Sequence, residues 1–455
     1  MKENTIAAIS TAQGQGGIGV IRISGEDAII VADRIFVSVS GKKLCELEGY
    51  KASYGKISFE GEILDEAVAV VYRAPHSYTG ENVVELCCHG GLYVTRSVLK
   101  AVLSSGADLA QPGEFTKRAF LNDKMDLSEA QAVMDIISAK SKQAARAAVS
   151  ARAGALSRRI KDISAKLVTS VAHLCAWADY PEEDIPEVTD EALLDTLVKV
   201  KDEISSLIND YDKGQAILHG IDTVIAGRPN VGKSTLMNLL TGFEKSIVTD
   251  IAGTTRDVVE ETVIVGNVTL RLCDTAGIRE TDNIIEKIGV DRTKERLSSC
   301  SLVLAVFDSS SPLDDEDLKL IESLGDVPAI AIINKTDLEQ NADLSIILEK
   351  IKDVVYISAK TGSGKNELED AVAKVTGTKE FDPSVGILSN ERQLQSTQKA
   401  FDAVEEALCT LRGGFSFDAV TVCVEEAIDA LLQLTGENVT EAVVDDVFHS
   451  FCVGK

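Results

Sequence analysis

The sequence of 455 residues lacks several features that would place it in a class of protein at once. No apolar run approaches the roughly 20 residues that cross a bilayer, and the first residues lack the basic and then apolar layout of an export signal. The nine cysteines are an odd number without a C-x-x-C spacing, and the five histidines are scattered. We therefore expect a cytoplasmic protein with reduced thiols, and no membrane span, disulfide framework or zinc site.

Basic residues are also scarce, because 46 Lys and Arg stand against 72 Asp and Glu and give a net charge of −26. Nucleic-acid affinity depends largely on neutralisation of phosphates by basic side chains, so we expect the chain alone to bind RNA poorly. One stretch is an exception and contains Lys140, Lys142, Arg146, Arg152, Arg158, Arg159, Lys161 and Lys166. A solvated helix face explains such a run. A docking surface for RNA or for a partner protein is the alternative.

The most informative segment is 227–234, with the sequence GRPNVGKS. It follows the apolar run 223–226 and precedes the helix-forming stretch 235–240, which is the strand, loop and helix context of a phosphate-binding loop. Glycines in such a loop turn successive backbone N–H groups toward phosphates at a helix N-terminus. Lys233 would neutralise the outer phosphates and the Ser234 hydroxyl would ligate Mg²⁺. The segment predicts a site for a nucleoside triphosphate.

Two later segments indicate which nucleotide is bound. The apolar run 329–333 ends in Asn334-Lys335-Thr336-Asp337. A carboxylate at Asp337 can accept hydrogen bonds from the ring N–H and the exocyclic amine of guanine, whereas adenine presents an acceptor to it. Ser358, Ala359 and Lys360 follow the next strand and match the third element of guanine recognition in GTPases. Together these segments predict GTP.

Two loops lie between the phosphate loop and the guanine loop. Residues 271–277 predict a strand that ends in Asp274, for the Mg²⁺ shell, and then Gly277, whose N–H senses the terminal phosphate. Residues 249–257 predict a loop that nucleotide state orders or releases, with Thr255 as a second Mg²⁺ ligand. The predicted nucleotide contacts are Asn230, Val231, Gly232, Lys233, Ser234, Thr235, Thr249, Asp250, Ile251, Ala252, Gly253, Thr254, Thr255, Asp274, Thr275, Ala276, Gly277, Asn334, Lys335, Asp337, Ser358, Ala359 and Lys360.

One absence concerns hydrolysis. Ile278 stands where many GTPases carry the glutamine that orients the attacking water, and isoleucine has no hydrogen bond to offer. Phosphoryl transfer also needs positive charge near the leaving oxygens, often from an arginine finger. A monovalent cation can replace that finger where oxygen ligands surround it. Asn230 and the carbonyls of an ordered switch loop are suitable ligands.

Several motifs resemble those of the potassium-activated GTPases, namely the Pro229-Asn230 pair, TDIAGTTRD at 249–257 and DTAGIR at 274–279. Three further segments narrow the resemblance to the tRNA wobble-uridine modification GTPases, the MnmE/TrmE family. These are GGIGVIR at 16–22, PGEFTKRAFLN at 112–122 and FCVGK at 451–455. The resemblance covers essentially the whole chain.

The resemblance implies the following site residues. Potassium would be ligated by Asn230, Thr249, Ile251 and Thr254, and magnesium by Ser234 and Thr255. The family's catalytic glutamate falls on Glu286, which would orient the water once two G domains pair. A folate site, similar to that of the aminomethyltransferases, would hold 5,10-methylene- or 5-formyl-tetrahydrofolate through Arg22, Glu85, Lys124 and Lys455. Cys452 is the candidate reactive thiol, and a cysteine without chemistry is the alternative.

The element pattern predicts a multidomain chain. An α+β domain at 1–120, implied to bind folate and to dimerise, precedes an all-α helical domain whose two parts occupy 121–216 and 381–455. An α/β P-loop GTPase domain at 217–380 is inserted between those parts. The C-terminal helical part is too short to bury a core alone, so we expect the two parts to pack together.

The resemblance also implies the reaction. A GTP hydrolase, acting with an FAD-containing partner of the MnmG/GidA type, would install a (carboxymethyl)aminomethyl group at carbon 5 of the wobble uridine of certain tRNAs. It implies a homodimer, potassium-dependent pairing of the G domains and a heterotetramer with the partner. Two alternatives stay open: a potassium-dependent ribosome-assembly GTPase, and a regulatory scaffold in which Cys452 is inert. The first would need a basic RNA-binding module, which the composition does not show.

Overall fold

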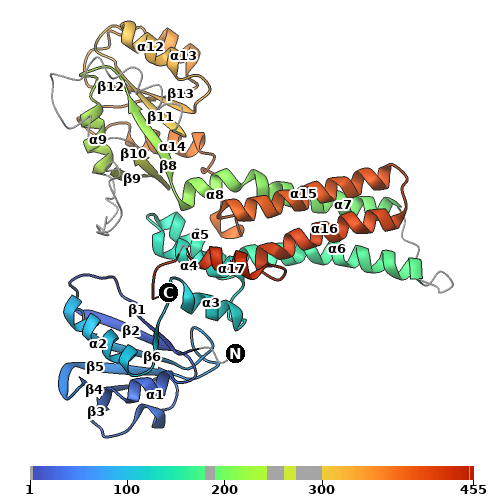
Figure 1. Ribbon diagram of the computed structural model, residues 1–455. Helices are drawn as coiled ribbons and strands as arrows, with labels where there is room; N and C mark the ends of the chain where they lie inside the picture. Colours follow the sequence, from blue (N-terminus) through green and yellow to red (C-terminus); the bar gives the residue numbers. More distant parts are fainter. Residues whose placement is uncertain (1–3, 180–189, 243–260, 273–299, 450, 455) are drawn as a thin grey trace. The chain divides into compact units, whose positions relative to one another are not determined.

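The computed structural model describes residues 4–179, 190–242, 261–272, 300–449 and 451–454 (Figure 1). The chain divides into two compact units, Met1–Met134 with Asp429–Lys455, and Asp135–Ile428. Among the described residues, no helix combines the length and the apolar character that crossing a bilayer requires.

A seven-stranded sheet with the order β3-β4-β5-β6-β2-β1-β7 forms the centre of the first unit. Its strands are β1 Ile6–Ile9, β2 Ile18–Ser24, β3 Phe36–Ser38, β4 Lys51–Phe59, β5 Glu62–Tyr72, β6 Val83–His89 and β7 Asp108–Leu109. Neighbouring strands pair antiparallel, apart from the parallel pair of β1 and β7. Arg22 of β2 lies directly opposite Glu85 of β6 in this register.

Helices cover one face of this sheet. Residues of α1 (Ala28–Asp33) and α2 (Leu92–Ser104) form one core cluster with Ala67, Ala69 and Val71 of β5. A short 3-10 helix, η1, spans Leu44–Glu46. Because side chains alternate across a strand, the residues between these buried positions lie on the opposite face. There, Val68 is 37% exposed and Tyr54 of β4 is 53% exposed, so part of that face is open.

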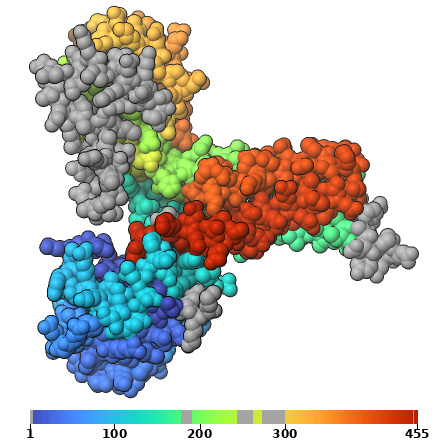
Figure 2. Space-filling model, in the orientation of Figure 1, coloured from blue at the N-terminus to red at the C-terminus, as the bar shows by residue number. Residues whose placement is uncertain are grey.

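The C-terminal segment belongs to the same unit as the N-terminal sheet. Helices α3 (Glu114–Leu121), α4 (Leu127–Ser138) and α17 (Glu441–His449) share a buried cluster that includes Phe448 and Phe451. Figures 1 and 2 show α17, in red, against α3, in cyan. Gly113 has φ 68°, and a Cβ there would lie 2.5 Å from the Phe448 carbonyl oxygen, so this close approach requires glycine.

Long helices form one part of the second unit: α5 Lys142–Arg152, α6 Ala155–Asp179, α7 Asp190–Asn209, α8 Tyr211–Leu218, α15 Glu391–Arg412 and α16 Phe417–Thr435, with η2 at Pro383–Val385. The unit boundary falls within α16, after Ile428. Apolar residues at helical spacing are buried in α7 (Leu193, Leu197, Val200, Ile204, Leu207) and give it one core-facing stripe. Lys201 of α7 pairs with Glu405 of α15 at 2.6 Å. Helices from before and after the inserted domain therefore pack on one another.

The other part of the second unit is built on a six-stranded sheet with the order β13-β12-β11-β8-β10-β9. Its strands are β8 Ile221–Ala226, β9 Glu261–Val265, β10 Val268–Leu272, β11 Leu302–Asp308, β12 Ala329–Asn334 and β13 Asp353–Tyr356. Only β9 pairs antiparallel within this sheet as described. The described helices beside it are α9 Lys233–Thr241, α12 Asp315–Ser323, α13 Ser345–Lys350 and α14 Lys365–Val375.

The buried strands of this sheet explain its architecture. All seven residues of β11 are buried, as parallel strands covered on both faces require. The loops after β8 and β12 leave the sheet at its carboxyl edge, where ligands bind in open α/β sheets. The predicted fold class is confirmed: an α+β N-terminal part, an all-α helical part and an inserted α/β P-loop part.

Candidate functional site

The phosphate loop joins β8 to α9 and needs glycine at both of its ends. Gly227 has φ 157°, and a Cβ there would lie 2.5 Å from the carbonyl oxygen of Val306 in β11. Gly232 has φ 99°, and a Cβ there would collide with the carboxamide of Asn334. Helix α9 then begins at Lys233 without a side-chain cap. No N-cap side chain therefore stands between the start of the helix and a ligand at the loop.

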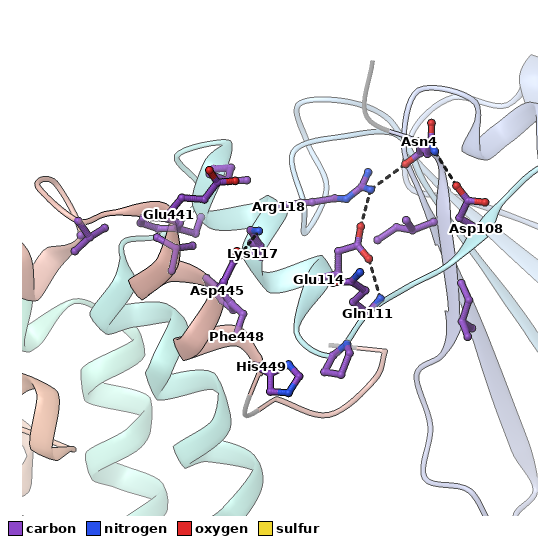
Figure 3. A pocket seen from close by; sticks show the side chains of 18 residues that line it. Asn4, Asp108, Gln111, Glu114, Lys117, Arg118, Glu441, Asp445, Phe448 and His449 are labelled. Atoms are coloured by element: carbon purple, nitrogen blue, oxygen red, sulfur yellow. Dashed lines mark hydrogen bonds and ion pairs between the residues drawn. The ribbon is translucent and has the colours of Figure 1, made fainter. Parts of the chain in front are cut away.

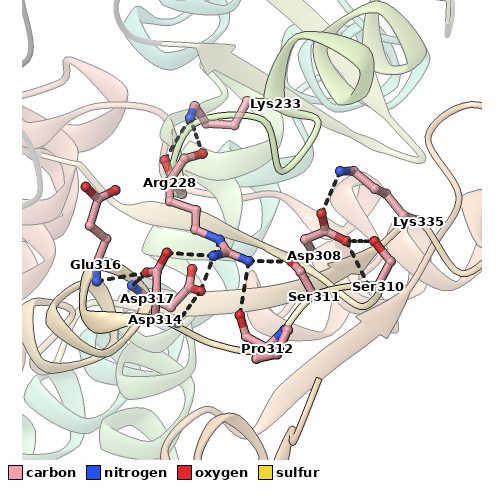
Figure 4. A network of polar contacts seen from close by, with 11 residues as sticks. Arg228, Lys233, Asp308, Ser310, Ser311, Pro312, Asp314, Glu316, Asp317 and Lys335 are labelled. Carbon is pink, nitrogen blue, oxygen red and sulfur yellow. Dashed lines mark hydrogen bonds and ion pairs between the residues drawn. The ribbon is translucent and has the colours of Figure 1, made fainter. Parts of the chain in front are cut away.

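Lys233 lies across this loop. Its Nζ donates to the carbonyl oxygens of Gly227 at 2.7 Å and Arg228 at 2.8 Å (Figure 4). Burial lowers the pKa of the Lys233 ammonium group. The Lys233 ammonium group thus binds carbonyl oxygens of the loop. When a nucleotide is bound, phosphate oxygens would replace these carbonyl oxygens as its partners. Ser234 and Thr235 follow in the first turn of α9, and both are exposed.

Asn334 connects the phosphate loop to the guanine-recognition segments. Its side chain is buried, donates from Nδ2 to the Val231 carbonyl oxygen at 2.8 Å and accepts at Oδ1 from the Ala359 N–H at 3.0 Å. Lys360 follows Ala359 directly. Three segments that are far apart in the sequence are therefore held together by one carboxamide.

Two carboxylates flank Asn334. Asp337 accepts a hydrogen bond from the Ser358 hydroxyl at 2.7 Å, and this bond lowers the pKa of Asp337. Lys335, with φ 64°, donates to Asp308 Oδ2 at 2.6 Å. Burial would raise the pKa of Asp308, but the Lys335 hydrogen bond and those from Ser310 outweigh it and lower the pKa. Asp337 is thus held as an acceptor, which the guanine edge requires.

Sequence reasoning missed two residues of this region. Asp308 ends the apolar run of β11, and a carboxylate at the end of a buried parallel strand is a signal that could have identified it. Arg228 lies inside the phosphate loop but contacts the β11–α12 connection, and nothing in the local sequence indicates this contact.

Part of the predicted site lies outside the described residues. These residues are Thr249, Asp250, Ile251, Ala252, Gly253, Thr254, Thr255, Asp274, Thr275, Ala276, Gly277, Glu286 and Lys455. Asn230 is described: it is exposed, and its φ of 64° lies in the left-handed region. Within the described part of the chain, no group of three or more His, Cys, Asp or Glu residues is arranged to hold a metal ion.

In the first unit, the structure brings two predicted folate residues together. Arg22 donates from Nε to Glu85 Oε1 at 2.9 Å, and a terminal nitrogen of its guanidinium lies 2.8 Å from the same oxygen. The guanidinium carbon also lies 5.4 Å from the ring centroid of Tyr78 and 5.7 Å from that of Phe115. The Tyr72 hydroxyl donates to Glu85 Oε2 at 3.4 Å. Burial, with the Glu85 charge, raises the pKa of Tyr72.

Lys124 and Cys452 lie elsewhere on this unit. Lys124 donates to the Pro75 carbonyl oxygen at 3.0 Å. Cys452 is exposed, and its carbonyl oxygen accepts from the Gly113 N–H at 3.3 Å. The Ser10 hydroxyl donates to the Gly454 carbonyl oxygen at 3.0 Å, so the C-terminal tail is held at the end of β1.

A pocket of about 930 Å³ lies beside α3 and α17 (Figure 3). Its buried Arg118 binds Glu81, Glu114 and the Asn4 carbonyl oxygen. At its rim, Lys117 pairs with Asp445 at 2.5 Å. None of the predicted folate residues that the structure describes lines this pocket.

Some side chains of the basic run 140–166 contact neighbouring elements, whereas others are exposed. Arg159 donates to the Gly386 carbonyl oxygen at 3.3 Å and to Ser206 Oγ at 3.1 Å. Lys166 pairs with Glu203 at 2.6 Å, and Arg146 lies 3.7 Å from Asp382. Several of these charges therefore join neighbouring elements of the helical part. The exposed members of the run also include Lys140, Lys142, Arg158 and Lys161.

A phosphate loop before an uncapped helix, an Asn-Lys-x-Asp segment and a Ser-Ala-Lys segment meet at one edge of a mainly parallel sheet. This arrangement defines a P-loop GTPase, an enzyme that binds and hydrolyses GTP. A family model described as the MnmE helical domain matches residues 127–452, and one described as the GTP-binding protein TrmE N-terminus matches residues 5–124. The chain belongs to the MnmE family of tRNA modification GTPases, as its motifs predicted.

Full-length relatives agree with the family models. The tRNA modification GTPase MnmE of Acetivibrio thermocellus is 42% identical over 460 residues, which cover 100% of both chains. That of Clostridioides difficile is 41% identical and covers 100% of this chain and 99% of its own. That of Bacillus subtilis is 41% identical and covers 99% of this chain and 100% of its own. The chain is therefore a GTPase of tRNA modification.

Solved structures resemble part of the chain. The G domain of the T. maritima FeoB iron transporter is 27% identical, with a TM-score of 0.26, and covers 34% of this chain and 98% of its own. Aquifex aeolicus Era bound to GDP and AlF4− is 28% identical, with a TM-score of 0.27, and covers 40% of this chain and 66% of its own.

Proposed function

We propose that this GTPase acts with an FAD-containing partner of the MnmG/GidA type to install a (carboxymethyl)aminomethyl group at carbon 5 of the wobble uridine of certain tRNAs. The observation that carries the proposal is the 42% identity to a tRNA modification GTPase along 100% of both chains. The partner's FAD supplies the redox chemistry. The odd number of cysteines fits a cytoplasmic enzyme with reduced thiols.

For hydrolysis, the chain's own residues would bind and orient GTP. Lys233 exchanges its bonds to the loop carbonyls for bonds to the outer phosphates, while Asp337 accepts from the guanine edge. Ser234 and Thr255 would ligate magnesium, and Asp274 would belong to its outer shell. Glu286, once two G domains pair, orients the attacking water in place of the missing glutamine. The bound cations supply positive charge that stabilises the departing phosphate oxygens.

Asn230 fits the role of a potassium ligand. Its carboxamide is exposed and makes no hydrogen bond to another described residue. It lies in the middle of the phosphate loop, where its backbone is left-handed. An amide oxygen is a hard ligand of the kind that such cations bind. Thr249, Ile251 and Thr254 would complete the potassium site.

The Arg22–Glu85 pair fits a pterin. The two side chains are 17% and 21% exposed, on the sheet face opposite α1 and α2. A carboxylate such as Glu85 can accept from the amine and ring N–H of a pterin, while Arg22, Lys124 and Lys455 suit carboxylates of the folate tail. Bound 5,10-methylene-tetrahydrofolate would supply the one-carbon unit, and 5-formyl-tetrahydrofolate would occupy the same site. Cys452 is the candidate reactive thiol.

The same open face supports assembly. Val68 and Tyr54 expose apolar surface there, and Ile18 of β2 is 67% exposed. Apolar residues grouped on one face are typical of a protein interface. We propose a homodimer through the N-terminal domains, potassium-dependent pairing of the G domains, and a heterotetramer with the FAD-containing partner.

Two measurements test the proposal. GTP turnover by the purified chain should be much faster in potassium than in sodium at equal ionic strength, and Glu286→Ala should abolish it without loss of GTP affinity.

Mass spectrometry of tRNA nucleosides from a deletion strain should show loss of the wobble modification with normal ribosomal subunits. Intact modification with defective subunits would instead indicate a ribosome-assembly GTPase. If a Cys452→Ser variant restored the wobble modification in the deletion strain, the Cys452 thiol would have no chemical role in the reaction.

A further inference from the structure

Arg228 lies in the phosphate loop two residues before Asn230, but its guanidinium points toward the β11–α12 connection (Figure 4). Its contacts are Asp314 Oδ2 at 2.6 Å, Asp317 Oδ2 at 3.2 Å, Ser311 Oγ at 2.6 Å and the Pro312 carbonyl oxygen at 3.3 Å. A planar guanidinium held at several of its nitrogens has little freedom to rotate. This set of contacts, the Arg228 clamp, therefore fixes the start of the phosphate loop to α12.

The acceptors of the clamp are themselves held by the start of α12. Asp314 is the N-cap residue and accepts from the N–H groups of Glu316 and Asp317 at 2.9 and 3.2 Å. Asp317 has a fully buried side chain, and its Oδ2 accepts from the Asp314 N–H at 3.2 Å. Its Oδ1 has no hydrogen-bond partner among the described residues. A buried carboxylate of this kind is costly without a cation beside it, and Arg228 is that cation.

The titration of these groups agrees with their geometry. The Arg228 hydrogen bond is the main cause that lowers the pKa of Asp314. Burial raises the pKa of Asp317 and outweighs the Asp314 amide and the Arg228 charge. The Arg228 guanidinium, like any arginine, is charged at neutral pH.

A second anchor holds the loop on the other side of Asn230. Val231 is buried, its carbonyl oxygen accepts from Asn334, and Gly232 packs against the same carboxamide. Between the Arg228 clamp and this anchor lie only Pro229, whose ring restricts its φ, and Asn230. Asn230 has a left-handed backbone, which asparagine tolerates better than most residues, and the fixed residues on both sides hold it in that conformation.

We propose that the Arg228 clamp is the positioning element of the potassium site, because it holds the Asn230 carboxamide in the geometry that binds the cation. The inference rests on the potassium role proposed above and adds a residue that does not touch the cation. Groups that orient a metal ligand without touching the metal affect metal affinity by about 10- to 100-fold. Release of the clamp should therefore weaken potassium binding more than nucleotide binding.

The test compares Arg228→Ala and Arg228→Lys in the full-length chain, with Asp314→Asn as a variant that weakens the clamp from its other side. Lys374→Ala is the control. It breaks the 2.6 Å ion pair of α14 with Asp353, the first residue of β13, at the sheet edge opposite the nucleotide loops. Three quantities are measured at constant ionic strength. The first is the potassium concentration that gives half-maximal GTP turnover. The second is the potassium-dependent rise in melting temperature of the chain loaded with GDP and aluminium fluoride. The third is the affinity for GDP.

Arg228→Ala should raise the potassium concentration for half-maximal GTP turnover by about tenfold. The potassium concentration that gives half of the full rise in melting temperature should increase by the same factor. GDP affinity should change little. Arg228→Lys keeps the charge but not the fork of donors, so it should lie between wild type and Arg228→Ala. Asp314→Asn should move in the same direction, and Lys374→Ala should match wild type.

The outcomes separate two failures. If wild-type turnover were equal in potassium and sodium, the potassium site itself would be wrong, and the clamp proposal would fall with it. If the wild type requires potassium but folded Arg228→Ala and Asp314→Asn keep its half-maximal concentration, only the clamp proposal is overturned. Equal losses of GDP and potassium affinity would also overturn it, since they indicate general damage to the loop.

Discussion

The two candidate ligand sites of this chain are held in different ways. In the G domain, Asn334 and Asp337 are fixed by backbone groups and by a hydroxyl. On the N-terminal sheet, Arg22 and Glu85 are held mainly by each other, and their other described contacts are to the side chains of Tyr72, Tyr78 and Phe115. The groups of the nucleotide site are therefore oriented by residues outside the ligand-binding set, whereas in the proposed folate site the two binding groups form an ion pair with each other.

This difference predicts different energetics of binding. Groups that are already oriented lose little entropy when the ligand arrives, and preorganisation of this kind increases affinity. A pterin that binds Glu85 must share or replace the Arg22 guanidinium. Part of its interaction energy is then offset by the loss of an existing contact. We expect nucleotide binding to be lost only by removal of a contacting group, and folate binding to respond to the balance of charge within the pair.

The largest expected effect is at Lys233. Lys233→Ala removes the ammonium that would stabilise charge on the outer phosphates, and removal of one preorganised donor of this kind costs about 100- to 1,000-fold in turnover. Steady-state GTP hydrolysis in potassium measures it. The Lys374→Ala variant is the matched control, because it removes a lysine of the same domain away from the loops. Retention of more than about a tenth of wild-type turnover by Lys233→Ala would contradict the role given to this residue.

The second effect is on the folate side. Glu85→Gln keeps the size of the side chain but removes the charge that holds Arg22, and hydrogen bonds to charged groups contribute about 1.5–3 kcal/mol. Calorimetry should therefore show affinity for 5-formyl-tetrahydrofolate reduced by about tenfold or more. GTP turnover by the same variant should match the wild type.

Glu66→Gln is the control for this experiment. Glu66 lies on β5, is exposed, and accepts from the Tyr54 hydroxyl at 2.6 Å. It has the same charge but no contact with Arg22. If Glu66→Gln reduced folate affinity as much as Glu85→Gln, overall charge would explain the effect, and the comparison of the two sites would lose its basis.

The same contrast explains what could be predicted from the sequence. The phosphate loop is contiguous from Gly227 to Ser234, so its glycines, lysine and following helix could be recognised together. Fold class and family followed from motifs of this kind and are confirmed. In contrast, Arg22 and Glu85 are 63 positions apart, and only the strand register places them opposite each other. The bare sequence could not identify that pair without the family resemblance.

Contacts made by long side chains were the least predictable. Arg228 was expected only as part of a loop, because its acceptors Asp314 and Asp317 lie in another element. The basic run 140–166 was recognisable as a cluster of charge, but the partners of Arg159 and Lys166 come from other segments of the helical part. Composition predicts that such charges exist. It does not predict which element each of them contacts.

The smallest expected effect concerns the ion pair of Lys335 with Asp308 behind the guanine loop. Its Asp308 side chain is 9% exposed, and the pKa of this carboxyl is lowered in the folded chain. A lowered pKa means that the folded state binds the proton less readily than the unfolded state. The stabilisation is therefore complete above the ordinary Asp value of about 3.9 and is lost as pH falls through the folded value.

Asp308→Asn tests this sign. Calorimetry of the full-length chain can follow the unfolding transition that GDP shifts to higher temperature, since a ligand stabilises the part that binds it. The variant should lower this transition by an amount that corresponds to roughly 1 kcal/mol or less, because one partner of the pair is part-exposed. The difference from wild type should stay constant from pH 7 to about pH 5 and shrink below about pH 4. A difference that disappeared between pH 7 and pH 5 would mean that a group with a higher pKa, and not Asp308, controls the support behind the guanine loop.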